Sequence, residues 1–340
     1  MNVAELTVIV PVFNGGALFE RCLAALRASE FSGFELIVVD DGSTDTSAEV
    51  ARRFGAEVLS TSVRSGPGAA RNLGSRRARG GIFCFIDADC AVHTDTLGRL
   101  VDYFRAHPEV DAAFGSYDRT PAAPGFIAQY KNLFHHYIHQ QSSEEASTFW
   151  AGCGAVRRET FLEAGGFDAE RFRRPSIEDI ELGGRLVRDG KTIRLVREIQ
   201  VTHLKAWNFV SLLRADLFDR AIPWSRLMFV RRDLVSDLNL RAHHRVSGVV
   251  AWLLLLLILA APFYPPAGTA GLVAGGLLVV LNLDFYRFLA RERGTLFALR
   301  AIPLHWLYYL YATAGFLIGA ILSFRDRDHR GRGPAPLVPR

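Results

Sequence analysis

Short apolar runs alternate with helical patterns over the first hundred residues of the chain. Runs rich in β-branched residues occupy 6–12, 34–39 and 82–86, where buried strands are predicted. Between them, 16–28 and 68–78 carry apolar residues at the spacing of an amphipathic helix. This alternation predicts an α/β fold with a doubly wound, mostly parallel sheet, whose ligands bind outside the carboxyl ends of the strands.

The pattern loosens after residue 112, where Pro and Gly residues interrupt it. We expect an aromatic, His-rich helix at 126–141 and another helix at 177–188. Strands are predicted at 149–156, 192–196 and 199–203. These elements complete the globular domain.

The last third of the chain contains three apolar stretches, at 246–264, 266–283 and 301–324. A membrane span needs about 20 apolar residues, so the first and third are long enough and the second is borderline. The segments 284–300 and 325–340 are both rich in arginine and therefore favour the cytoplasm. Three full spans cannot satisfy both, so either one stretch is re-entrant or interfacial, or the tail lies outside.

Before these stretches, residues 206–245 have the pattern of basic amphipathic helices, which tend to lie in the membrane interface. The chain thus divides into a globular domain at 1–205, interfacial helices at 206–245, two to three transmembrane segments at 246–324 and a tail at 325–340. Attraction to anionic lipid is expected from arginines 214, 220, 226, 231 and 232.

Composition fits a membrane-attached cytoplasmic protein better than a nucleic-acid-binding one. The chain has 340 residues, 49% of them hydrophobic, and a net charge of +5. A basic balance beside apolar segments fits contact with anionic lipid. The four cysteines form no zinc or CxxC pattern, and the N-terminus has no signal-peptide pattern. We therefore expect free thiols and a multi-pass protein of the cell membrane whose globular domain is cytoplasmic.

Polar residues follow two of the predicted strands and open one helix. Asp40 and Asp41 end the second strand, where a carboxylate can accept from a base N–H or from ribose hydroxyls. The same residues are also typical of a helix-capping turn. Arg71 lies in a helix opened by small residues, from which it can reach a phosphate or the base.

A second acidic pair suggests a metal. Asp87 and Asp89 directly follow the apolar strand at 82–86 and place hard oxygen ligands at the edge of the sheet. Mg²⁺ or Mn²⁺ bridging to a diphosphate needs one or two such carboxylates, with water and phosphate completing the shell. The alternative is a solvated pair of acids in a loop.

Taken in order, these motifs resemble the family 2 glycosyltransferases of the GT-A fold, which are inverting enzymes. The resemblance covers about residues 5–205. The matching pieces are Pro11-Val12-Phe13-Asn14, Asp40-Asp41-Gly42-Ser43, Gly68-Ala69-Ala70-Arg71-Asn72, Asp87-Ala88-Asp89, Trp150-Ala151-Gly152-Cys153-Gly154 and Glu178-Asp179.

The resemblance implies roles for individual residues. Donor-binding residues would be Pro11, Asn14, Asp40, Asp41, Arg71 and Asp87. The acceptor would meet the donor sugar near Trp150, Gly152, Cys153 and Glu178. Asp89 would bind the metal, and Asp179 matches the catalytic base. His203, which ends a late strand, would complete the metal site, although a lone His is more often structural.

The choice of Asp179 also has a chemical argument. An inverting transfer is a single displacement, in which one carboxylate takes the proton of the acceptor hydroxyl. Departure of the diphosphate needs a metal rather than an acid. Glu178 and Glu181 are alternatives, because acids in the first turn of a helix also complement its dipole.

The sequence therefore predicts transfer of a sugar from a nucleotide diphosphate donor, with UDP expected from the family, to a lipid or lipid-linked acceptor. The Gln-x-x-Arg-Trp signature of processive cellulose-synthase-like enzymes is missing. A processive polysaccharide synthase is one alternative. An inactive sugar-nucleotide-binding membrane scaffold is another, although the intact Asp87, Asp89 and Asp179 argue against it.

Overall fold

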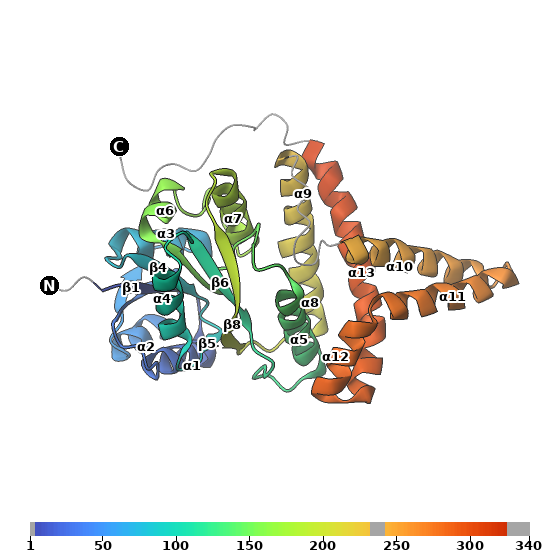
Figure 1. The fold of residues 1–340 in the computed structure, drawn as a ribbon, viewed down its shortest axis with the longest axis horizontal. Coiled ribbons are helices and arrows are strands. Elements are labelled where there is room, and N and C mark those ends of the chain that lie inside the picture. Colours follow the sequence, from blue (N-terminus) through green and yellow to red (C-terminus); the bar gives the residue numbers. More distant parts are fainter. Residues whose placement is uncertain (1–3, 232–241, 325–340) are drawn as a thin grey trace. The chain divides into compact units, whose positions relative to one another are not determined.

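The computed structural model describes residues 4–231 and 242–324, which fall into two compact units (Figure 1). Unit 1 contains residues 4–128 and 142–206, and unit 2 contains the remaining described residues, including 129–141. The predicted tail at 325–340 and Arg232 lie outside the described residues.

Unit 1 begins with four parallel strands. They are β1 (Leu6–Val12), β2 (Phe34–Asp40), β3 (Glu57–Ser60) and β4 (Ile82–Ile86). Their order across the sheet is β3-β2-β1-β4, with every neighbouring pair parallel. The carboxyl ends of all four strands therefore meet at one edge, as the sequence predicted.

The second half of the sheet departs from the predicted parallel pattern. β7 (Cys153–Arg157) runs antiparallel to β4 and to β6 (Ala112–Tyr117). β8 (Ile193–His203) runs parallel to β6 but antiparallel to the short β5 (Cys90–Val92). The sheet is therefore mixed, with four parallel and three antiparallel pairs of strands. The two predicted late strands are one long strand, whose pairing with β6 shifts register midway.

Helices cover both faces of this sheet and bury it. One face packs mainly against α1 (Gly16–Arg27) and α4 (Thr96–Ala106), and the other against α3 (Pro67–Arg77), α6 (Arg158–Glu163) and α7 (Glu178–Arg188). A further short helix, α2, spans Ser47–Arg53. All five residues of β4 are buried, which explains why its run is apolar without alternation.

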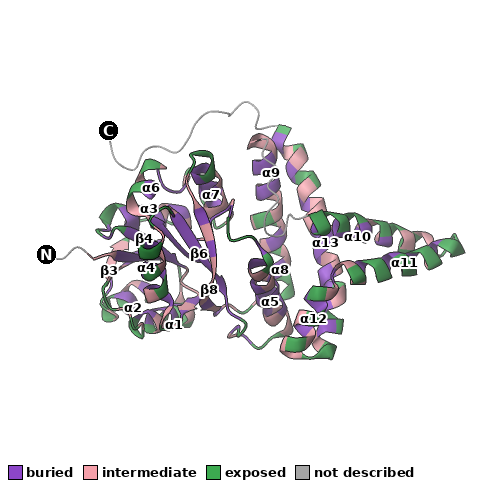
Figure 2. Cartoon of the chain, in the orientation of Figure 1, coloured by how far each residue is buried: buried purple, intermediate pink, exposed green. Residues whose placement is uncertain are grey.

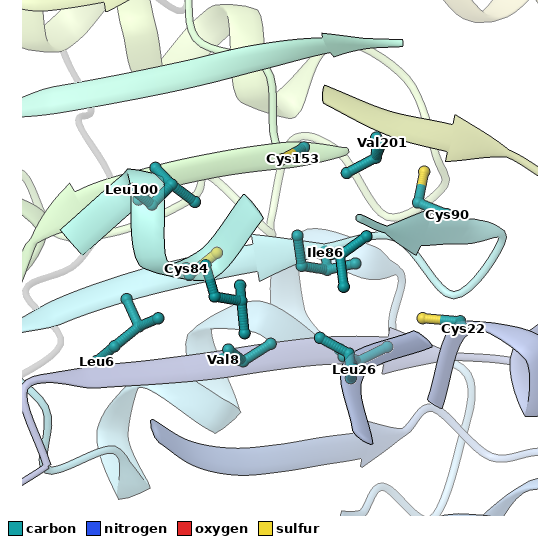
Figure 3. Packing of buried hydrophobic residues seen from close by; sticks show 14 of the residues in the cluster. Leu6, Val8, Cys22, Leu26, Cys84, Ile86, Cys90, Leu100, Cys153 and Val201 are labelled. Atoms are coloured by element: carbon teal, nitrogen blue, oxygen red, sulfur yellow. The ribbon is translucent and has the colours of Figure 1, made fainter. Parts of the chain in front are cut away.

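The four cysteines are free and buried, as expected. Cys22, Cys84, Cys90 and Cys153 belong to one apolar cluster of unit 1, where their thiols lie among aliphatic side chains (Figure 3). Burial raises the pKa of the Cys153 thiol to about 12, so it stays protonated and behaves as a small apolar group.

Unit 2 is helical and takes in a segment from the middle of the chain. Its helices are α5 (Phe126–Gln141, from Gln129 onward), α8 (Phe209–Arg214), the π-helix η1 (Ala215–Ala221), α9 (Ile222–Arg231), α10 (Ala242–Ala260), α11 (Pro265–Leu281), α12 (Leu283–Arg293) and α13 (Thr295–Ser323). The ring of Phe134 on α5 lies 5.3 Å from that of Phe285 on α12 and 4.9 Å from that of Tyr308 on α13.

Three segments of unit 2 have the character of membrane spans. By length and composition α10 and α13 are each able to cross a membrane, and α11 with α12 would make a third, bent by 66°. The arginine-rich segment at 284–300 is helical and forms most of α12 and the start of α13, where Phe285, Tyr286 and Leu289 repeat at helical spacing and are buried.

Candidate active site

A network of hydrogen bonds joins the carboxyl ends of β1 and β2. Asn14 follows β1 with a positive φ of 50°, and its backbone N–H donates to the Ser43 hydroxyl at 2.9 Å. The Asn14 side-chain oxygen accepts from the Thr44 N–H at 2.8 Å. Asp40 Oδ1 accepts from the Ser43 N–H at 3.0 Å. Two predicted donor-binding residues, Asn14 and Asp40, are thereby brought into one hydrogen-bonded network. Pro11, a third, is buried in β1 just before Asn14.

The Asp41 side chain makes different contacts from those of the adjacent Asp40. Its two oxygens accept from the backbone N–H groups of Ser65 at 2.8 Å and Gly66 at 2.7 Å, and from the Thr61 hydroxyl at 3.1 Å. The side chain is buried, so it holds the loop that leads into α3. These contacts give Asp41 a structural role, and its contact with the donor stays a prediction.

Arg71 lies inside the site rather than on its surface. Its guanidinium donates to Asp87 at 2.7 Å and to Glu178 at 3.0 Å, and only 4% of the residue is exposed. Ser176 N–H donates to the other oxygen of Glu178 at 2.9 Å. Arg71 and Glu178, predicted for donor and acceptor contact, thus form a buried bridge that holds Asp87, whose side chain stays 34% exposed.

Two adjacent backbone groups join Asp87, predicted to contact the donor, to Asp179, the predicted base. The N–H of Asp87 donates to the carbonyl of Gly152 at 3.2 Å, beside the β4–β7 pairing. The N–H of the preceding Ala151 donates to Asp179 Oδ2 at 3.1 Å. Asp87 and Asp179, 92 residues apart in the sequence, are therefore held by consecutive residues.

Asp89 and His203 meet because β5 pairs with the end of β8. Cys90 lies opposite His203 in this pairing, and the Leu204 N–H donates to the Asp89 carbonyl at 2.8 Å. His203 Nε2 lies 3.5 Å from Asp89 Oδ2. The structure thus brings together the two residues predicted as metal ligands.

An aromatic group that the sequence analysis did not identify lies beside this pair. Tyr117, at the end of β6, stacks on the His203 ring with centroids 4.4 Å apart. The Trp150 ring meets Tyr117 edge-on at 4.8 Å. Trp150 is half-buried, and its ring also lies against Gly152, where a Cβ would come within 2.4 Å of it. Tyr117 follows an apolar run at a strand end, as Asp87 does, and that position was its only signal.

Two other predicted or alternative residues turn out to be structural. The Cys153 side chain is fully buried in the core, so only its backbone could serve the predicted acceptor contact, which stays a prediction. Glu181 is paired with Arg185 at 3.0 Å and is 2% exposed, which explains its place in α7 without any role in chemistry.

The carboxylates of the site differ in their pKa. Burial and the charge of Glu178 raise the pKa of Asp179 to about 6. Burial also raises the pKa of Asp87, although the positive charge of Arg71 acts to lower it. Burial acts to raise the pKa of Asp89 as well, but the hydrogen bond and charge of His203 and the charge of Lys205 outweigh it and lower that pKa. Of these three aspartates, only Asp89 has its anionic form favoured by its surroundings.

This donor set fits a divalent cation only in part. One carboxylate and one imidazole are suitable ligands, and the Asp89 side chain remains 29% exposed on its open side. Among residues 4–231 and 242–324, no group of three or more His, Cys, Asp or Glu residues could hold a metal ion. Asp89 and His203 would therefore hold Mg²⁺ or Mn²⁺ together with ligands from water or substrate.

Comparison with known proteins agrees with this arrangement. Residues 7–165 match the family model described as Glycosyl transferase family 2. Glycosyltransferase AglE of Haloferax volcanii is 37% identical over 102 residues, which are 28% of this chain and 34% of AglE. The chain spans about a third of the length of such curated relatives. Residues 7–165 thus resemble a glycosyl transferase family 2 domain.

Other relatives match over more of their length. The uncharacterized protein MT1568 of Mycobacterium tuberculosis is 25% identical over 276 residues, which are 75% of this chain and 84% of that protein. The mannosyltransferase PcManGT of Pyrobaculum calidifontis, solved with GDP-Man and Mn²⁺, has a TM-score of 0.56 at 20% identity and covers 92% of this chain and 87% of its own. TarS residues 1–349 of S. aureus, solved with UDP-GlcNAc, has a TM-score of 0.53 at 17% identity, covering 96% and 92%. These solved structures support the GT-A fold.

Proposed function

We propose that this chain transfers a sugar from a nucleoside diphosphate sugar to an acceptor hydroxyl with inversion, and that Asp179 is the catalytic base. One observation carries the proposal: consecutive backbone groups of Ala151 and Gly152 hold Asp179 and Asp87. A single displacement needs the base and the donor side of the site fixed relative to each other, and this segment fixes them.

Asp179 has the properties of a general base. With a pKa of about 6 it is ionised at neutral pH, yet it is more basic than an ordinary aspartate. Its oxygens accept from Ala151 N–H and from its own helix at Ile180 N–H. A carboxylate has about four lone-pair sites, so the acceptor hydroxyl still finds an acceptor there.

The donor would bind on the side of the site that holds Asp89 and His203. A bound divalent cation would neutralise the charge that develops on the leaving diphosphate. Asp89 and His203 would hold that cation, with Lys205 close enough to influence Asp89. PcManGT bound to GDP-Man and Mn²⁺ and TarS bound to UDP-GlcNAc support a nucleoside diphosphate sugar as donor. The two neighbours differ in their base, so UDP stays a prediction.

We further propose a lipid or lipid-linked saccharide as acceptor, used at the cytoplasmic face of a membrane. The apolar α10, α11 and α13 support membrane attachment. Exposed arginines of the helices before α10, among them Arg214 and Arg220, would add attraction to anionic lipid. A lipid-linked acceptor then stays within reach of a chain that is anchored in the same membrane.

Donor hydrolysis by the full chain in detergent tests the donor side. We expect one of a panel of nucleoside diphosphate sugars to be cleaved with Mn²⁺ or Mg²⁺, and cleavage to stop in excess EDTA and resume when metal is returned. Cleavage that EDTA leaves unchanged would contradict the metal site, and no cleavage of any donor would contradict the proposed reaction. Adding a lipid extract then reports transfer, and product length separates single transfer from polymer synthesis.

A further inference from the structure

We infer that unit 2 crosses the bilayer only through a hairpin formed by α10 and α11, and that α13 lies along the cytoplasmic membrane surface. By length and composition alone α13 is a candidate span, so the inference concerns which of the apolar helices actually cross. It holds whether or not the chain transfers a sugar.

The hairpin has the dimensions and composition of two short spans. Its 19-residue and 17-residue helices are about 28 Å and 25 Å long, close to the roughly 30 Å hydrocarbon core. No charged residue occurs between Arg245 and Asp284. Exposed positions run along both helices (Figure 2), and leucine and valine residues such as Leu253, Leu256, Leu272 and Val280 are among them. At the apex Phe263 is 90% exposed, where an aromatic belt would meet the far interface.

α13 has a different neighbour along much of its length. Tyr311 donates from its hydroxyl to Asp216 on η1 at 2.8 Å. One turn later, a Cβ at Gly315 would lie 2.8 Å from that of Ala221, and after another turn a Cβ at Gly319 would lie 2.6 Å from that of Ser225. Both chains advance in the same direction, so α13 runs parallel to η1 and α9 in close contact, with small residues at each approach.

That neighbour is too polar to lie in hydrocarbon. The helices η1 and α9 carry several charges over 17 residues, and Arg220 is exposed. If α13 crossed the bilayer, these helices would cross beside it and carry Arg220 and its neighbours into the apolar core. Charged side chains there are costly and rare. Since the two helices are packed together, α13 is held at the level of its charged partner.

The opposite side of α13 suits the surface of a bilayer. Leu296, Leu299, Leu317 and Ile321 are exposed on it, whereas His305 and Tyr309 face the interior of unit 2. A helix with one apolar exposed side and one polar packed side lies in the plane of the interface. Figure 1 shows the hairpin leaving α13 partway along its length, so the two cannot both be upright in one membrane.

The connections between the hairpin and α13 come from the base of the hairpin. His244 Nδ1 is 2.9 Å from the Tyr309 hydroxyl, which itself donates to Asn282 at 2.6 Å. A Cβ at Gly248 would lie 2.6 Å from Thr313. His244 lies in the first turn of α10, and Asn282 directly follows α11. Tyr309 therefore connects both helix ends at the base of the hairpin to α13.

Charge fixes the orientation. The base of the hairpin is flanked by Arg245 and by the arginines of α12, whereas its apex at 261–265 has no charge. The positive-inside rule therefore places the base, α12 and both ends of α13 on the cytoplasmic side. This arrangement satisfies both arginine-rich segments, at 284–300 and 325–340, which three full spans cannot.

Cysteine labelling of the full chain in oriented membrane vesicles tests this topology. The four native thiols are buried and provide a low background. Single cysteines replace exposed residues in the variants Phe263→Cys, Arg291→Cys and Phe324→Cys, with Glu30→Cys as a matched reporter on unit 1. Each variant is treated with a membrane-impermeant maleimide in inverted and in right-side-out vesicles.

We expect the variants at 30, 291 and 324 to be labelled in inverted vesicles and the variant at 263 in right-side-out vesicles. Labelling at 324 from the same side as 263 would overturn the inference, because α13 would then span. Failure to label 263 from either side would overturn the crossing hairpin. Donor hydrolysis measured on the same vesicles reports the proposed activity separately, so one failure cannot be mistaken for the other.

Discussion

Each unit buries a cation that pairs with a carboxylate, but the two arrangements leave different groups exposed. In unit 1, Arg71 bridges Glu178 and Asp87, and the Asp87 side chain remains 34% exposed. In unit 2, Lys131 on α5 pairs with Asp216 on η1, whose other oxygen accepts from Tyr311 and whose side chain is only 7% exposed. The first arrangement leaves the Asp87 carboxylate available to a ligand, whereas in the second both oxygens of Asp216 are already paired within the protein.

This difference indicates two uses of buried charge. Under the proposed function Arg71 positions Asp87 for the reaction, so substitutions around it should affect the rate more than folding. The Lys131–Asp216 pair joins α5 to the helices that follow unit 1, so damage there should affect stability. A π-helix often marks a functional site, but here it serves to turn Asp216 toward both Lys131 and Tyr311.

The largest effect should come from Asp89→Asn. The amide keeps the size of the side chain but removes the charge that would hold the cation, so nearly all turnover should be lost while the fold persists. Activity measured across a Mn²⁺ titration checks this. Wild-type rates at ordinary metal concentration would remove Asp89 from the metal site.

Asp179→Asn should leave donor binding intact and slow transfer by about 10²–10⁴-fold, the usual cost of losing a positioned base. Calorimetry of nucleotide-sugar binding, set beside the transfer rate, separates the two properties. Asp189→Asn, at the exposed far end of α7, is the matched control and should behave as wild type. A fully active Asp179→Asn would mean that another carboxylate is the base.

Asp216→Asn should destabilise the protein by about 3–5 kcal/mol, because it leaves the buried Lys131 ammonium without its charge partner. Thermal unfolding in detergent measures the loss. The double variant Lys131→Met with Asp216→Leu removes both charges and should recover most of it. If the single variant is as stable as wild type, the pair does not hold unit 2 together.

The smallest effect concerns pH. Because the pKa of Asp179 is raised to about 6, the base should be protonated below that pH. The rate constant kcat/KM should then fall about tenfold per pH unit below 6 and level off above it. An aspartate with an ordinary pKa near 4 would keep full activity at pH 5. A profile that is flat between pH 5 and 7 would contradict the assignment.

Sequence reasoning located the strand ends well because buried parallel strands are continuous apolar runs and the polar residues follow them directly. The turn of Asn14 and Asp40 and the acids after β4 were found in this way. The direction in which a side chain points was less predictable from the sequence. Arg71 was expected to face a phosphate, but Glu178, 107 residues later, turns it inward, and no local pattern encodes that pairing.

The elements that the sequence did not predict also depend on long-range pairing. The short β5 has only three residues, and it is a strand because these residues pair with the end of β8. Tyr117 reaches His203 for the same reason. No helix was predicted at α12, because its arginines outweighed the apolar side of a short helix.

The discontinuity of unit 2 has a consequence for the order of synthesis. Helix α5 leaves the ribosome long before its partners: the ring of Tyr130 lies 6.2 Å from Phe285, which is 155 residues further along the chain. At about 5–20 residues per second, α5 must wait roughly 7–30 s between its own completion and the start of α12. During that time the aromatic side of α5 has no permanent partner from α12. A chaperone that holds α5 until α12 and α13 are made would therefore raise the yield of folded protein.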